Sequence, residues 1–97
     1  MERKILIIHL VTVKKTVTKE EKAKTNYLRL FGSNLIEIRL SKGLSQHELA
    51  YRSQIDKNQI GNIERGEKNA TTYTLSRIIK GLEIEPNELF DFENTSK

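Results

Sequence analysis

The chain has 97 residues and a mass of 11.2 kDa, which suffices for one hydrophobic core and excludes a second independent fold. With 36% hydrophobic residues, 31% charged residues and a mean hydropathy of −0.57, the composition is that of a globular domain. The lack of cysteine excludes a disulfide framework and a thiolate site and favours a cytoplasmic location. Because there are only two histidines, we expect no metal and no cofactor.

The formal net charge of +4 is unevenly distributed along the chain. Residues 1–30 carry eight bases against three acids, residues 31–80 carry eight against five, and residues 81–97 carry one against five. A basic surface upstream of an acidic tail suits a polyanionic partner, although a charged run is also the ordinary solvated face of a small domain.

The only apolar run, Ile5–Val13, is half the length that a membrane span needs, so we expect no membrane association. Its β-branched residues predict a β-strand, followed by a basic linker over 14–24. An apolar strand needs a partner, and we expect it to pair antiparallel with its twin in a homodimer. A leader without fixed structure and an over-long reading frame remain the alternatives for residues 1–26.

Downstream of residue 26, the apolar residues recur with the period of a helix. One apolar stripe is formed by Leu28, Phe31, Leu35 and Ile38. The stripe predicts a first helix over 27–42, which Gly43 ends because a residue without Cβ suits a left-handed cap. In Ser45-Gln46-His47-Glu48 the Ser45 hydroxyl and the Glu48 carboxylate are spaced to accept each other's backbone amides, which predicts a second helix over 46–53.

The third helix is predicted over 57–65, with Asp56 as its cap, Gln59 completing a second capping box, and Gly66 after its end. Thr71 or Thr72 caps the fourth helix. The apolar face of that helix consists of Leu75, Ile78, Ile79 and Leu82. Pro86 starts a short last helix, since its missing amide costs nothing there, and residues 93–97 are expected to fray.

Five helices, two of them short, must pack as one orthogonal cluster because none buries a large face alone. Ala50 is small enough to let the second helix cross closely and so to set the angle of a helix-turn-helix. The predicted fold class is therefore all-α, a compact five-helix bundle with a helix-turn-helix over 27–92, preceded by an extension (1–26) with one β-strand and followed by the tail.

The motifs that identify a family are Gly43-Leu44-Ser45-Gln46-His47-Glu48-Leu49-Ala50, Ile60, Ile63-Glu64-Arg65-Gly66, Leu75 and Gly81-Leu82-Glu83-Ile84. They resemble the Cro and phage-repressor type, or xenobiotic-response-element, family of helix-turn-helix regulators over about residues 28–91. The resemblance implies a lambda-repressor-like domain that binds double-stranded DNA, dimeric on an inverted repeat, with helix 57–65 in the major groove. It also implies an ion pair between Arg39 and Glu64.

The turn of the motif departs from the family, because Gln54 stands where glycine is common. If Gln54 takes positive φ, the strain is of order 1 kcal/mol, which a packed domain can absorb.

The outward face of the third helix predicts which residues contact DNA. With Ile60 and Ile63 turned inward, the expected base contacts are Lys57, Asn58, Gly61 and Asn62. The expected phosphate contacts are Ser45, Gln46, Arg65, Lys68 and Asn69. Tyr51 and Tyr73 could stack on sugar or phosphate, but aromatic residues on amphipathic helices more often fill gaps in the packing, and we expect the latter.

Catalysis is not expected, since each acid that could act as one of a pair, such as Glu48 or Glu64, already has a structural assignment. The alternative function is a protein-interaction adaptor or antitoxin-like module on the same fold.

Overall fold

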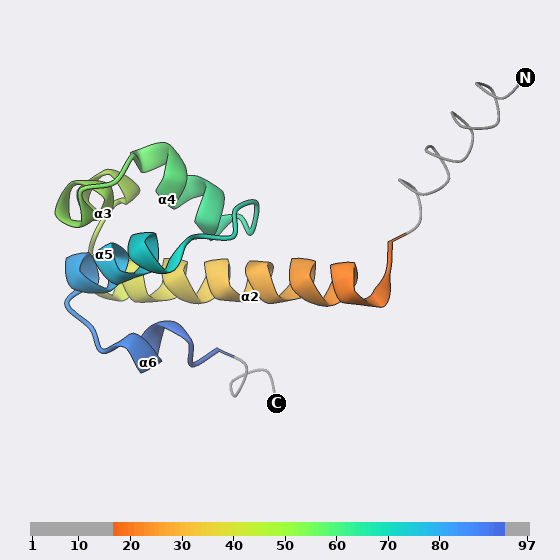
Figure 1. The fold of residues 1–97 in the computed structure, drawn as a ribbon. Helices are drawn as coiled ribbons and strands as arrows, with labels where there is room; N and C mark the ends of the chain where they lie inside the picture. The colour runs from red at the N-terminus through yellow and green to blue at the C-terminus, as the bar shows by residue number, and fades with distance from the viewer. Residues whose placement is uncertain (1–16, 93–97) are drawn as a thin grey trace, which may run out of the picture.

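The computed structural model describes residues 17–92, and its helices follow one another without an intervening strand in that range. They are α2 (Lys19–Ser41), α3 (Gln46–Ser53), α4 (Lys57–Glu64), α5 (Thr72–Leu82) and α6 (Pro86–Leu89). Figure 1 shows α3, α4 and α5 gathered over the C-terminal half of α2, with α6 on the opposite side of that helix. The described helices include none that is both long and apolar enough to cross a membrane.

Helix α2 begins eight residues before the predicted start at Tyr27, so the prediction of a linker is wrong for residues 19–24. The Thr18 side chain caps the helix by accepting from the Glu21 amide at 3.0 Å. Residues 17–27 are exposed, so no apolar stripe marks these turns, and they project beyond the other helices in Figure 1. The Thr-x-x-Glu spacing was the local signal for this start. The predicted strand over 5–13 and the tail over 93–97 lie outside the described residues.

The core lies where α2, α3, α4 and α5 meet, and α6 closes one end of it. Its buried apolar residues are Phe31, Leu35, Leu44, Leu49, Ala50, Ile60, Ile63, Ile78, Leu82, Leu89 and Phe92. The predicted stripes therefore face this core, with Ile38, Leu75 and Ile79 half-buried at its edge, whereas Leu28 is half-buried outside it.

Two glycines set the closest helix approaches. A Cβ at Gly32 would overlap the Glu64 carbonyl, and a Cβ at Gly81 would overlap the Ser53 hydroxyl. Gly32 therefore lets α2 cross α4, and Gly81 lets α5 cross α3. Ala50 is buried as predicted, but these glycines are the positions at which a larger side chain could not fit.

Most of the predicted helix ends are confirmed. The Ser45–Glu48 capping box is present, with both bonds at 3.0 Å, and Thr71 rather than Thr72 caps α5. The second capping box is wrong: Asp56 accepts from the Asn58 amide at 2.8 Å, and no bond joins the Gln59 side chain to the Asp56 amide.

Candidate nucleic-acid interface

Helices α3 and α4 form the predicted helix-turn-helix, and the turn between them contains a left-handed residue. Gln54 has φ 56° and ψ 42°, so the case that the sequence left open, a left-handed residue other than glycine, is the one that occurs. Arg77 of α5 holds this turn: its Nε donates to the Ser53 carbonyl at 2.9 Å, and its Nη2 donates to Oε1 of Gln54. The guanidinium also lies over the Tyr73 ring, 5.3 Å from its centroid. A third helix therefore stabilises the strained residue.

A buried ion pair fixes α4 against α2. Nε and Nη2 of Arg39 donate to the two carboxylate oxygens of Glu64 at 2.6 and 3.2 Å, which confirms the predicted pair. Nη1 of Arg39 donates to the Leu44 carbonyl, and the Gln46 amide donates to Glu64 at 2.8 Å. Because Glu64 thus binds α2 and the start of α3 at once, the orientation of α4 is set from its inner face.

The outer face of α4 contains three of the four predicted base contacts as accessible side chains. Lys57 and Asn58 are exposed, and Asn62 is half-buried. Gly61 is instead buried, because the Arg65 guanidinium covers it. Asparagine amides can read adenine bidentately, and lysine can reach guanine acceptors, so this face has the chemistry of a base-reading surface.

Gln59 is a residue that the sequence reasoning missed. It was assigned to a capping box, yet the structure leaves its side chain half-buried on α4 without that role. On the helical wheel it lies next to Asn62, at the edge of the outer face. Its position within the third helix was the available signal, and its amide gives it the same reading chemistry as asparagine.

The predicted phosphate contacts lie at the two ends of the motif. At the start of α3, the Ser45 amide is occupied by Glu48, whereas the Gln46 and His47 amides precede the first intrahelical bond and are available to an anion. The Gln46 side chain is committed to Glu64, so its contribution to an anion site rests on its backbone. After α4, Asn69 is exposed and Lys68 half-buried.

The Glu48 carboxylate lies at the same end of α3. Its hydrogen bonds from the Ser45 backbone amide and from Ser45's side chain lower the pKa of Glu48. Glu48 therefore stays ionised at neutral pH and complements the positive end of α3.

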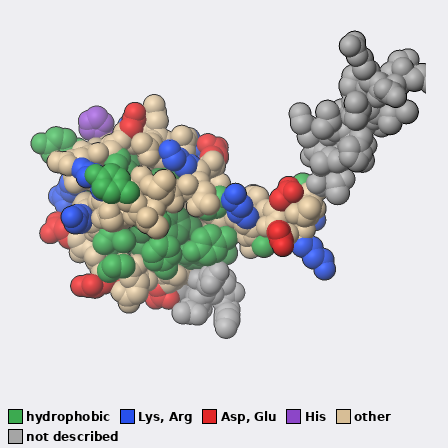
Figure 2. Space-filling view, viewed as in Figure 1, with side chains coloured by type: hydrophobic (Ala, Val, Ile, Leu, Met, Phe, Trp, Pro, Cys, Tyr) green, Lys and Arg blue, Asp and Glu red, His purple; other side chains and the backbone are tan. Residues whose placement is uncertain are grey.

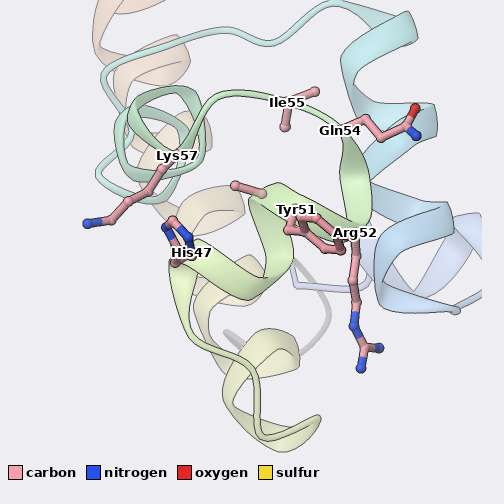
Figure 3. A pocket seen from close by; sticks show the side chains of 7 residues that line it. His47, Tyr51, Arg52, Gln54, Ile55 and Lys57 are labelled. Carbon is pink, nitrogen blue, oxygen red and sulfur yellow. The ribbon is translucent and has the colours of Figure 1, made fainter.

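A shallow pocket lies between α3 and the start of α4 (Figure 3). Its lining consists of His47, Ala50, Tyr51, Arg52, Gln54, Ile55 and Lys57. Tyr51 is 83% exposed and Tyr73 66%, so the prediction that both tyrosines fill gaps in the packing is wrong. In Figure 3 the Lys57 and Arg52 side chains extend outward on either side of the pocket, which adds positive charge beside the reading helix.

A second hollow lies over α2, beside the loop that joins α4 to α5. It is lined by Tyr27, Leu28, Phe31, Lys68, Asn69, Ala70, Leu75 and Phe90. Figure 2 shows a group of apolar side chains on this side of the molecule. Of the residues that line the hollow, Tyr27 is 39% and Phe90 43% exposed.

This architecture, with its polar reading helix, defines a helix-turn-helix protein of the DNA-binding class. The helix-turn-helix family profile matches residues 35–89, more than half of the chain. The control protein C.BamHI of Bacillus amyloliquefaciens is 40% identical over 70 residues, which cover 70% of this chain and 86% of that protein. The chain belongs to the helix-turn-helix family, as its motifs predicted.

Solved structures agree with this assignment. The restriction-modification controller protein C.AhdI from Aeromonas hydrophila is 43% identical, with a TM-score of 0.64, over 65% of this chain and 96% of that one. The controller protein C.Esp1396I, solved as a tetramer in complex with its natural 35 base-pair operator, is 36% identical with a TM-score of 0.65, over 71% of this chain and 91% of that one.

Proposed function

We propose that this protein is a transcriptional regulator that binds double-stranded DNA sequence-specifically, as a homodimer on an inverted repeat, with α4 in the major groove. The observation that carries the proposal is the outer face of α4, where Lys57, Asn58 and Asn62 share one accessible surface. Glu64, on the opposite face, locks the helix to α2. A reading helix needs this combination, because a mobile helix loses the geometry of bidentate contacts.

The DNA contacts fall into two groups, one to base edges and one to phosphates. Base edges are read by Lys57, Asn58, Gln59 and Asn62, whereas Gly61 is covered by the Arg65 guanidinium and makes no base contact in this proposal. The amides at the start of α3, together with Lys68 and Asn69, hold phosphates and set the register. The chain acts by binding rather than by catalysis, in the cytoplasm where the DNA lies.

The similar proteins support a more specific proposal for the biological role of this chain. C.AhdI and C.Esp1396I are restriction-modification controller proteins, and C.AhdI matches over nearly its whole length. We propose that this chain likewise controls a restriction-modification gene set. Footprinting on the DNA flanking its own gene tests this role: protection upstream of an endonuclease or methyltransferase gene supports it, and protection at unrelated genes only contradicts it.

Selection of bound sequences from a random duplex pool tests the DNA-binding function itself. The expected result is an inverted repeat with half-sites about one helical turn apart, bound with an affinity that falls steeply as salt rises. A pool without enrichment contradicts sequence-specific binding. Binding to a protein partner with little salt dependence would instead support the adaptor or antitoxin-like alternative.

A further inference from the structure

The side chain of Arg65 lies back along α4 instead of extending from its end. Arg65 is the C-cap residue of α4, and its Nη2 donates to Oδ1 of Asn62 at 2.5 Å. Its Nε donates to a carboxylate oxygen of Glu67 at 3.1 Å. The guanidinium is therefore held at both sides, between a predicted base contact and an acid that follows the helix.

Gly61 makes this path possible. A Cβ built at Gly61 would come within 3.0 Å of Nη1 of Arg65, and within 3.8 Å of its Cζ and Nη2. Glycine inside a helix is less favourable than alanine, so its presence in the middle of α4 needs a reason. The covered position supplies one, because even a Cβ there would require the guanidinium to shift by a few tenths of an ångström from its place beside Asn62.

The contact with Arg65 decides how the Asn62 amide is oriented. An adenine edge in the major groove needs the amide oxygen as acceptor and the amide nitrogen as donor, in one orientation. The guanidinium has only donors, so it can bind the oxygen and not the nitrogen. The oxygen keeps a second lone pair for a base, and the nitrogen keeps both of its hydrogens.

We propose that Arg65 is a positioning residue that presets the Asn62 amide for reading a base, with Gly61 as the surface on which it lies and Glu67 as its anchor. This inference rests on the proposed DNA-binding function. It replaces the predicted role of Arg65 as a phosphate contact. It also gives Glu67 a role near the DNA, where an acid would otherwise only repel phosphates.

The test compares affinities of the full chain for the selected operator and for random duplex, each over a range of salt concentrations. Arg65→Lys keeps the charge and loses the fork that binds both Asn62 and Glu67. We expect it to lower the ratio of specific to non-specific affinity by roughly tenfold, within the range of one bidentate base contact, with the salt dependence unchanged. A phosphate contact would behave oppositely: Arg65→Lys would retain the ratio, and Arg65→Ala would weaken both affinities equally and reduce the salt slope by about one.

Gly61→Ala gives a second test, which distinguishes an effect on the positioning of Asn62 from an effect on the stability of the fold. Alanine favours the helix, so the melting temperature should not fall, while the specificity ratio should fall as in Arg65→Lys. An unchanged ratio overturns the proposal.

Coupling identifies the residue through which Arg65 acts. In an Asn62→Ala background, Arg65→Lys should cost no further specificity, and a full additional loss contradicts positioning. If the unmodified chain shows no preferred sequence, the DNA-binding function has failed rather than this inference.

Discussion

Arg39 of α2 and Glu64 of α4 form a buried two-bond ion pair, with Nε to Oε2 at 2.6 Å and Nη2 to Oε1 at 3.2 Å. Only 10% of the Arg39 side chain and 2% of the Glu64 side chain are exposed. Since the Leu44 carbonyl and the Gln46 side chain also bind the pair, it joins α2 to both helices of the helix-turn-helix at one point.

Removing one partner of this pair should be costly, because the other charge would remain buried. We expect Glu64→Ala to lower the free energy of unfolding by about 3 to 5 kcal/mol, measured by urea denaturation. Glu67→Ala is the matched control, because its ion pair with Arg65 is more than half exposed and should contribute about 1 kcal/mol at most. Equal losses in the two variants would contradict the structural role of Glu64.

The readout on α4 predicts a contrast between amide and lysine variants. Asn58→Ala or Asn62→Ala should cost roughly 1 to 3 kcal/mol on the selected operator and little on random duplex. Lys68→Ala should weaken both complexes about equally, because a phosphate contact carries no sequence information. Gln59→Ala should behave like the asparagine variants. Titration of labelled duplexes measures each case, and an unchanged sequence preference in the asparagine variants would show that α4 is not the reader.

The left-handed residue at Gln54 predicts which substitutions the turn tolerates. Gln54→Val should destabilise the protein by roughly 1 to 2 kcal/mol, since a β-branched residue resists positive φ. Gln54→Asn should change stability less, because asparagine visits this conformation readily. Thermal unfolding of the two variants measures the difference. The same stability in both would mean that the turn relaxes to another conformation.

The lowered pKa of Glu48 predicts a pH dependence of stability. The Ser45 backbone amide is the main cause, with the Ser45 side chain second. A pKa that is lower in the folded than in the unfolded state stabilises the fold above the unfolded pKa, and that stabilisation is lost as pH falls through the folded pKa. The unmodified chain should therefore have a higher free energy of unfolding than Glu48→Gln at neutral pH. This difference should shrink on acidification below about pH 4, near the ordinary glutamate pKa. A difference in free energy of unfolding that stays the same at every pH would contradict this.

The predicted strand over 5–13 can be tested by truncation. A chain of residues 17–97 keeps the Thr18 cap of α2 and removes the apolar run. Sedimentation should show weaker dimerisation of this chain than of the full chain if the strand is the dimer element. Equal dimerisation constants would exclude the strand. In that case Phe90→Lys, in the apolar hollow over α2, should disrupt the dimer.

The sequence by itself determined the local features of this protein. The Ser45–Glu48 capping box depends on hydrogen bonds within four residues, so its spacing predicts it. The apolar stripes likewise predicted the inward faces of the helices, because helical period and burial are tied together. The start of α2 was missed because it has a cap but no stripe, and periodicity alone cannot detect an exposed helix.

The tertiary structure decided which partners the polar side chains take. Gln46 lies eighteen residues from Glu64 in the chain and could have remained free for DNA, but the packing of α3 against α4 brings its amide to 2.8 Å from the carboxylate. Arg77 reaches the turn only because Gly81 lets α5 approach α3. A long side chain has several acceptors within its reach, and only the packed arrangement of the helices leaves one in the right place.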